Sequence, residues 1–300
     1  MDTLKKTISL AGIALLTIFH STACNMCGCG TSVFYTGLLN YSGTNFISLQ
    51  GTYSGLHTLD EFTSSDINSY YLSTMLTGSM QIIRGKWDAQ MYLPYMFNSY
   101  HVADTDPFNI NGLGDMGILN HITVLHSNDS SKATWNLAVK AGLELPTGNF
   151  NQDYREEDVP PALSAGSGSW DVITGLRFSY FKNKFGIYGD YMFKLNTQNN
   201  SNYKFGNQNI SNVIVSYRIP AGRSTITPLI GILSEFIDYD TFYGYDQHGT
   251  SGVNVYGIGG LDFNTGRFNT GCNINLPVHS RYDNNASSVI RGSVHVGYVF

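Results

Sequence analysis

The chain contains little charge, only four cysteines and no long apolar run beyond its first residues. Asp, Glu, Lys and Arg make up 13% of the 300 residues, which is about half the share in ordinary soluble domains. Lys and Arg form no cluster and the net charge is −5, which argues against a nucleic-acid partner. The single apolar run, residues 7–19, is shorter than the roughly 20 residues of a transmembrane helix. These absences exclude a helical membrane protein and an ordinary soluble domain.

The N-terminal residues have the features of a secretory signal peptide. Lys5 and Lys6 precede the apolar run, and small residues at 21–23 precede Cys24. We therefore expect cleavage near Cys24. The chain is then divided into a signal peptide (1–23), a cysteine-containing N-terminal segment (24–43) and one large domain (44–300).

Glycine and aromatic residues are abundant, with 32 Gly, 20 Tyr and 17 Phe, while the mean hydropathy is slightly negative. This combination is typical of strands that expose one face to lipid and the other to water. From residue 44 onward, apolar and polar residues alternate with a period of two. In the last such segment, for example, Val294 and Val296 share one face and His295 lies on the other.

The alternation predicts an all-β fold, a transmembrane antiparallel up-and-down β-barrel of about 12 strands, with 10–14 as the range. Both ends of the barrel chain then lie in the periplasm, and residues 24–43 form a short periplasmic or plug segment. A soluble β-sandwich is the competing architecture. We expect strands at 44–57, 67–83, 86–102, 113–127, 132–146, 168–182, 184–197, 203–219, 223–239, 251–265, 267–281 and 287–300.

The connections between these strands alternate between short and long, as in bacterial barrels. Acidic residues gather in the long connections, and basic residues gather at the short turns. A soluble sandwich has no reason to separate charge in this way, so the pattern favours the barrel. We expect Trp87, Trp135 and Trp170 in an aromatic girdle at the periplasmic ends of their strands.

Charged residues recur on the polar faces of the predicted strands, where a water-containing lumen tolerates them. Both signs are present, so internal salt bridges are expected. The candidate lumen-lining residues are Lys140, Glu144, Asp171, Arg177, Asp190, Lys194, Arg218, Glu235, Asp262 and Arg291. The histidines show neither a metal-binding spacing nor a serine nucleophile motif nearby. We expect no enzymatic activity and no cofactor.

Residues 139–150 (VKAGLELPTGNF) resemble a motif of the outer-membrane transporters named after the meta-pathway of phenol degradation. Residues 111–115 and 166–171 resemble two further motifs of that family, so the resemblance covers roughly residues 110–220. It implies a transporter with hydrophobic or aromatic cargo. It also places Asp115, Pro146, Thr147, Gly148 and Asp171 at the outer mouth. Pro146 lacks a ladder donor and ends a strand, and Gly148 permits a sharp turn into the loop.

The C-terminal strand ends in Phe300 and resembles the signal that the barrel-assembly machinery reads in outer-membrane proteins. This resemblance implies that the chain resides in the bacterial outer membrane. The expected partners are therefore outer-membrane lipid, the barrel-assembly machinery and a small-molecule solute.

Three cysteines, Cys24, Cys27 and Cys29, lie together, and Cys272 stands alone. The segment resembles the Cys-x-x-Cys-Gly-Cys start of a group of barrels from Bacteroidota. A disulfide is the default in an oxidising compartment, with Cys24–Cys27 feasible and Cys29 free or joined to Cys272. The spacing also suits a soft metal ion such as Zn²⁺ or Cu⁺, although a structural zinc site needs four ligands. Lipidation of Cys24 is the third interpretation, although Ser21 stands where a lipobox usually has Leu.

The sequence therefore predicts a passive outer-membrane transporter or channel for small hydrophobic or aromatic solutes. One alternative is a surface barrel that transports nothing and binds cations or a partner through its acidic loops. A second alternative is metal traffic through the three N-terminal cysteines.

Overall fold

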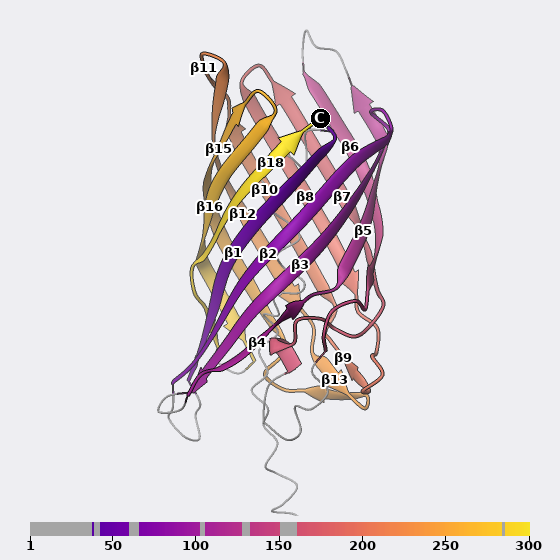
Figure 1. The fold of residues 1–300 in the computed structure, drawn as a ribbon, viewed down its shortest axis with the longest axis vertical. Coiled ribbons are helices and arrows are strands. Elements are labelled where there is room, and N and C mark those ends of the chain that lie inside the picture. Colours follow the sequence, from indigo (N-terminus) through magenta and orange to yellow (C-terminus); the bar gives the residue numbers. More distant parts are fainter. Residues whose placement is uncertain are drawn as a thin grey trace, which may run out of the picture.

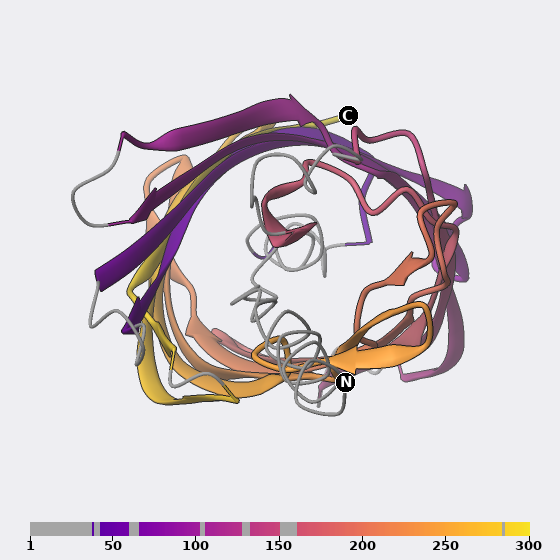
Figure 2. The same ribbon diagram turned by 90° about the horizontal axis from the view of Figure 1, so that it is seen from below.

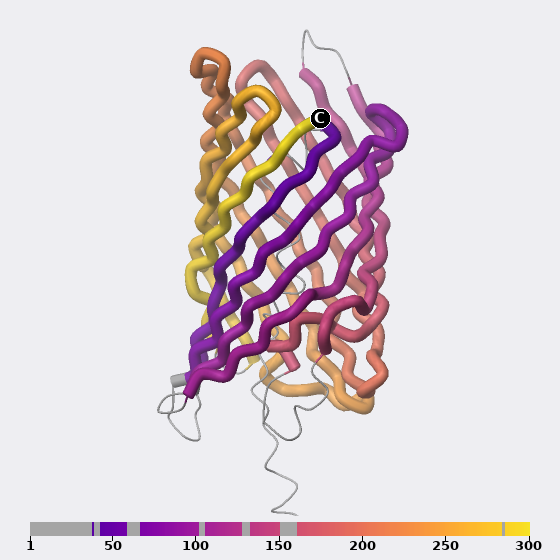
Figure 3. The backbone as a smooth tube through the Cα atoms, viewed as in Figure 1, coloured from indigo at the N-terminus to yellow at the C-terminus, as the bar shows by residue number. Residues whose placement is uncertain are grey.

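A computed structural model of the chain describes residue 38 and residues 43–59, 66–102, 106–127, 133–150, 161–283 and 286–300. These residues form a closed antiparallel β-barrel of 12 strands, which confirms the predicted fold class and strand number. The strands run at a steep tilt to the barrel axis (Figures 1 and 3). No helix in the described part of the chain has the length and apolar character needed to cross a membrane.

Each wall strand pairs with the next one along the chain, and the last pairs with the first to close the ring. One wall strand is split into β4 and β5, β10 continues into β11, and β17 precedes β18. The wall elements are β1 (Phe46–Leu59), β2 (Asp66–Ile83), β3 (Trp87–Val102), β4 (Phe108–Leu113), β5 (Met116–Ser127), β6 (Thr134–Leu145), β7 (Asp171–Lys182), β8 (Phe185–Leu195), β10 (Gln208–Tyr217), β11 (Ile219–Ala221), β12 (Ser224–Ile237), β15 (Gly252–Thr265), β16 (Phe268–Tyr282), β17 (Ser287–Ser288) and β18 (Arg291–Val299).

The alternation in the sequence becomes an alternation of exposure along every long strand. In β18, Val294 is 61% exposed and Val296 is 51% exposed, whereas His295 between them is buried. Large apolar side chains thus cover the outside of the wall, and the buried face of each strand points inward. This arrangement is the one that a lipid-facing wall requires.

Short turns lie at one end of the barrel, and we call it the short-turn end. Gly85, Asn183, Gly222 and Gly266 have positive φ values in four of these turns, which glycine and asparagine adopt more readily than other residues. The opposite, long-loop end carries the connections of β1–β2, β3–β4, β6–β7, β8–β10, β12–β15 and β16–β18. Figure 1 shows β11 and the C-terminus at the short-turn end and β9 and β13 at the other.

Three predicted boundaries at the long-loop end are wrong. Residues 203–219 do not form one strand, because β9 (Tyr203–Lys204) belongs to a separate small sheet, whereas β10 and the first residue of β11 lie in the wall. The expected loop 240–250 contains the other two strands of that sheet, β13 (Asp240–Phe242) and β14 (Tyr245–Gln247). The expected loop 103–112, between the predicted strands 86–102 and 113–127, contains β4. This strand pairs with β3 and continues the wall towards the long-loop end.

The break between β4 and β5 lies opposite Pro94 of β3. Gly114 N donates to Pro94 O at 2.9 Å, and the ladder to β3 resumes only at the pair Tyr92–Gly117. A residue in a strand directs its N–H and C=O to the same neighbour, so the missing N–H of Pro94 faces the break. Proline is tolerated inside a wall strand here because no ladder bond is required of it.

Candidate functional site

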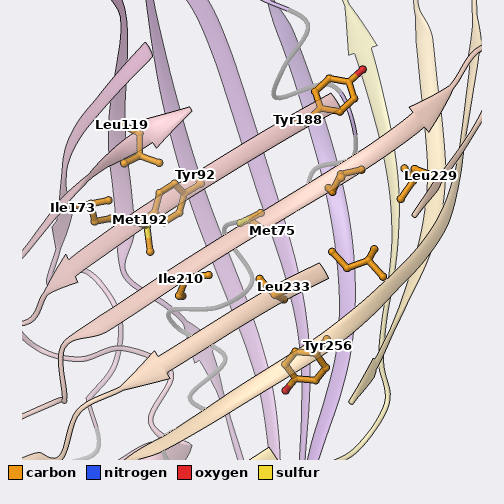
Figure 4. Close-up of a cluster of buried hydrophobic side chains, with 12 residues drawn as sticks. Met75, Tyr92, Leu119, Ile173, Tyr188, Met192, Ile210, Leu229, Leu233 and Tyr256 are labelled. Carbon is orange, nitrogen blue, oxygen red and sulfur yellow. The ribbon is translucent and has the colours of Figure 1, made fainter. Parts of the chain in front are cut away.

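A belt of apolar side chains lines the inside of the barrel. Figure 4 shows these side chains on several facing strands. We call this set the interior belt: Met75, Tyr92, Leu119, Ile173, Tyr188, Met192, Ile210, Ile214, Leu229, Leu233, Tyr256 and Ile258. The sequence indicates two members of the belt, because Tyr188 and Met192 share the inward face of β8 with Asp190 and Lys194. The predicted lumen lining contains only charged residues, so it does not include these aromatic and aliphatic side chains.

An ion network on β6, β7 and β8 is centred on Asp190. Lys140 Nζ donates to Asp190 Oδ1, and Arg177 Nε lies 3.6 Å from Asp190 Oδ2. Lys140 and Asp190 are buried, whereas the Arg177 side chain keeps 12% exposure. His121 is paired with Lys140 in the sheet register, and in the described structure its ring nitrogens have no hydrogen-bond partner.

A second network joins two carboxylates to one lysine. Lys194 Nζ lies 2.5 Å from Glu144 Oε1 and 3.4 Å from Asp171 Oδ2. Tyr92 of the interior belt donates its hydroxyl to Glu144 Oε2 at 2.8 Å. Because all these groups are buried, the pairing offsets the desolvation cost of each charge, and the network binds β3, β6, β7 and β8 together.

A third network lies on the opposite side of the ring. Arg291 makes two hydrogen bonds to Glu235, with Nη1–Oε1 at 2.8 Å and Nη2–Oε2 at 3.2 Å. Its guanidinium carbon lies 4.7 Å from the centroid of the Tyr256 ring, an arrangement that suits a cation–π contact. Both groups are buried. Because their opposite charges are paired with each other, they add no unpaired charge to the interior.

Asp262 binds the N-terminal segment. Its Oδ2 accepts a hydrogen bond from the backbone N of Leu38 at 2.9 Å, and the Leu38 side chain packs against the interior belt. His295 lies nearby, with Nε2 2.8 Å from Asn269 Oδ1 and 3.9 Å from Asp262 Oδ1. Leu38 is thus inside the barrel, although most of segment 24–43 is outside the described residues.

Nine of the ten candidate lumen residues therefore fall into the four groups described above, and Arg218 stands apart from them. Arg218 differs from the others because it is exposed at the short-turn end, where its guanidinium lies 4.6 Å from the centroid of the Phe181 ring. Arg177 is partly exposed. The remaining eight are buried: Lys140, Glu144, Asp171, Asp190, Lys194, Glu235, Asp262 and Arg291.

The residues assigned by resemblance to the outer mouth come together around Asp115. Asp115 is buried, and its Oδ1 accepts from Gly148 N at 2.8 Å, while Oδ2 accepts from Ser167 N at 2.6 Å and Ser167 Oγ at 2.7 Å. Thr147 Oγ1 accepts from Met116 N at 2.8 Å. Pro146 directly follows the end of β6. Three motifs that are distant in sequence thus interlock, and Ser167 was the residue that sequence reasoning missed.

This interlock is linked to the interior by a chain of hydrogen bonds. Ser167 Oγ lies 3.0 Å from Ser169 Oγ, which donates to Asp171 Oδ1 at 2.8 Å. Asp171 belongs to the Lys194–Glu144 network described above. The contacts at the mouth and the Lys194–Glu144 network are therefore one continuous polar structure.

The long-loop mouth is partly covered by inward-folded loops. The short 3₁₀ helix η3 (Pro161–Leu163) lies within the outline of the ring in Figure 2, and Leu163 O accepts from Asn98 Nδ2 at 2.7 Å. Leu163 also packs in a cluster with Leu56, Tyr71 and Tyr282, so this loop reaches the far wall.

The small sheet at the mouth is held by the buried carboxylate of Asp240. Gly206 N donates to its Oδ1 at 2.6 Å, and Tyr203 donates its hydroxyl to Oδ2. Asp283 makes an exposed contact nearby, where the Gly249 N–H holds the pKa of its carboxyl below the ordinary value.

The remaining expectations concern the cysteines, a metal-binding site and the tryptophans. Cys272 is a free, exposed thiol, and Cys24, Cys27 and Cys29 lie outside the described residues. Among the described residues, no group of three His, Cys, Asp or Glu side chains is arranged to hold a metal ion. Trp87 and Trp135 follow short turns, but Trp170 borders the long β6–β7 connection, so the expectation that all three lie at the periplasmic end is wrong.

The fold and its exterior define the class: an outer-membrane-type β-barrel. The chain belongs to the family described as the MetA-pathway of phenol degradation, which matches residues 49–226. This match confirms the predicted family and extends the resemblance into the N-terminal third. Among curated proteins no significant sequence relative is found.

One solved structure has the same type of fold. An outer membrane channel from Pseudomonas putida F1 superposes with a TM-score of 0.64 at 14% identity, over 86% of this chain and 96% of that one. The β-domain of the Bordetella autotransporter BrkA has a TM-score of 0.49 at 10% identity, over 86% and 100% of the two chains. LpxR from Salmonella typhimurium has a TM-score of 0.45 at 8% identity, over 84% and 100%. At 14% identity the likeness to the channel concerns the fold alone.

Proposed function

We propose that the protein is a passive outer-membrane channel for small hydrophobic or aromatic solutes, without enzymatic activity. The observation that carries the proposal is the interior belt, because an apolar lining inside a barrel offers aromatic solutes a surface on which to bind. The long-loop end would face the outside and the short-turn end the periplasm. Solute would enter past the exposed Tyr243 and Tyr245 of the small sheet.

The charges near the belt support an uncharged or weakly charged solute. Asp190 is paired with Lys140 and Arg177, and Glu235 with Arg291. A charge that is already paired and hydrogen-bonded attracts a mobile ion less than a free one does. The networks therefore stiffen the wall, and the buried belt would become available to apolar solutes once the segment packed against it at Leu38 is displaced.

The contact between Leu38 and Asp262 supports a plug role for residues 24–43. Leu38 occupies part of the belt that a solute would use. We propose that the segment narrows the pore and that its displacement opens the route. The Cys-containing part of the segment, with its disulfide, metal or lipid chemistry, stays a prediction, as does the Bacteroidota resemblance.

The test uses planar bilayers with refolded protein. Reversal potentials would compare benzenesulfonate with methanesulfonate, and benzyltrimethylammonium with tetramethylammonium, so that aromatic character is varied at constant charge. We expect each aromatic ion to be favoured roughly tenfold, the effect of about 1.4 kcal/mol, and the 24–43 deletion to raise the total conductance.

The belt itself is tested by the double variant Ile210→Asn/Ile214→Asn, with Ile210→Val/Ile214→Val as the matched apolar control. The asparagine variant should lose the preference for the aromatic ions, and the valine variant should keep it. An absence of conductance in both the full chain and the deletion would overturn the channel. Conductance without any aromatic preference would overturn the choice of solute.

A further inference from the structure

A hollow on the outside of the barrel lies across β1, β2, β3 and β4, which are adjacent at the front of Figure 1. We call it the outer groove. It has a volume of about 330 Å³, and its lining includes Tyr53, Tyr70, Leu72, Phe97, Asn109 and Asn111. Tyr53 and Phe97 are 46% and 40% exposed on the lipid-facing side of the wall. The groove is therefore separate from the lumen.

The register of the strands gives the groove two different walls. Tyr53 is paired with Leu72, Leu72 with Phe97, and Phe97 with Asn111, so these four side chains form one row. The next row towards the long loops runs from Tyr70 through Ser99 to Asn109. Aromatic side chains thus stand on β1 and β2, amides stand on β4, and Leu72 and Phe97 form the floor between them.

The tyrosine wall is built around a glycine. Gly55 is paired with Tyr70, and a Cβ at Gly55 would lie 3.3 Å from Tyr70 Cδ1. The Tyr53 and Tyr70 rings are stacked, with centroids 6.3 Å apart and planes at 19°. The two rings therefore form a fixed aromatic surface, which is better suited to a flat ligand than two independent side chains would be.

The amide wall has unused hydrogen-bonding capacity. Within the described residues the side chains of Asn109 and Asn111 make no hydrogen bond, and both are exposed. Each amide offers two donors and one acceptor oxygen. None of the described residues that line the groove carries a charged side chain. A ligand for this site therefore combines an apolar face with uncharged polar groups.

The groove lies where the apolar exterior of the barrel ends. Beyond Tyr53, Tyr70 and Phe97 towards the long loops, the next outward positions carry glycine or a polar side chain. They are Gly55 and His57 on β1, Asn68 on β2, and Ser99 and His101 on β3. In a membrane this level corresponds to the border between acyl chains and headgroups. A ligand at this level is supplied by the lipid leaflet itself.

We propose that the outer groove binds a neutral, sugar-headed lipid of the outer leaflet. The sugar ring stacks on Tyr53 and Tyr70, its hydroxyls bind the amides of Asn109 and Asn111, and an acyl chain lies along Leu72 and Phe97. The site goes beyond the proposed transport and depends only on the orientation given above. It remains testable in a barrel that conducts nothing.

The competing explanation is an ordinary aromatic girdle with no ligand preference. The barrel offers a matched control on β8 and β10, where the outward-facing Tyr191 donates its hydroxyl to Asn209 Oδ1 at 2.9 Å. This pair has the same residue types as the groove, but its amide oxygen is already bonded. Substitutions at Asn209 therefore change the exterior to a similar degree without removing the proposed amide wall.

The experiment places the full chain in nanodiscs with equal parts of monogalactosyl diacylglycerol, phosphatidylcholine and phosphatidylglycerol of identical acyl chains. Native mass spectrometry then counts the lipids that stay bound. We expect the galactolipid to be enriched roughly fivefold or more among retained lipids, as about two net hydrogen bonds allow. Asn109→Leu/Asn111→Leu and Tyr53→Ala should each abolish this enrichment, and Asn209→Leu should leave it unchanged.

Folding of each variant is verified by SDS gel electrophoresis, in which an unheated, folded barrel migrates differently from the heated, unfolded chain. Retained lipid that follows the bulk composition would overturn the proposal, as would enrichment of phosphatidylglycerol. Equal loss of enrichment in Asn209→Leu would also overturn it, because the effect would then belong to the girdle as a whole.

Discussion

Among single residues, Asp115 is a buried carboxylate that satisfies donors from two distant segments. Asp115→Ala would leave Gly148 N and both Ser167 donors without this acceptor. Each buried unsatisfied donor costs roughly 1–3 kcal/mol, so we expect a loss of several kcal/mol in the urea-unfolding free energy in micelles. Asp283→Ala, at an exposed carboxylate, should change it by about 0.5 kcal/mol or less. Equal effects of the two substitutions would contradict the central role of Asp115.

The Glu235–Arg291 pair makes a second prediction at the residue scale. Arg291→Met leaves the buried Glu235 without its cation, which should cost about 3–5 kcal/mol. The double variant Arg291→Met/Glu235→Leu removes both charges, and we expect it to be more stable than either single variant. A double-mutant cycle of unfolding free energies measures this coupling. Simple additivity of the two single costs would show that the charges do not interact.

At the scale of elements, glycines allow three loop segments to cross closely at the mouth. A Cβ at Gly148 would lie 2.7 Å from both Gly114 C and Gly166 Cα, which real side chains do not tolerate. Gly148→Ala should therefore destabilise the barrel by about 1–3 kcal/mol through overpacking. Gly259→Ala is the control, because a Cβ there meets nothing within 4 Å, and strand alanine is slightly preferred over glycine. Similar unfolding midpoints for both variants would contradict the crossing.

The wall strands could be predicted from sequence because exposure follows a strict period of two in elements such as β8 and β18. The small sheet could not, because β9 and β13 contain two and three residues and depend on the distant carboxylate of Asp240. The period of two likewise indicated that Glu144 and Lys194 face the lumen. It could not indicate that Tyr92, on a distant strand, donates a hydrogen bond to Glu144. Long-range partners leave no periodic trace in a single sequence.

The free thiol of Cys272 gives a prediction at the scale of the whole molecule. It is paired with Leu261 and Val294 on the exposed outer face, which would lie in lipid. In liposomes, with Cys24, Cys27 and Cys29 replaced by serine, a charged maleimide should label Cys272 slowly, because lipid excludes the charged reagent. Denaturation should restore full labelling.

The control for this labelling experiment is Tyr245→Cys in a Cys272→Ser background, at a position that is 77% exposed in the mouth loops. Its labelling should be fast in the folded protein. If Cys272 reacts as quickly as this loop thiol, the wall around β15, β16 and β18 does not face lipid, and the proposed placement in the membrane is wrong.

The seam between β1 and β18 has a consequence for how the chain is made. It pairs Phe46 with Val299 and Tyr53 with Gly292, so the ring joins residues near opposite ends of the sequence. Closure of so long a loop carries a high entropic cost and favours slow folding. Until it occurs, β1 and β18 present open edges whose backbone groups lipid cannot satisfy. We therefore expect the chain to insert into the bilayer only together with its last strand.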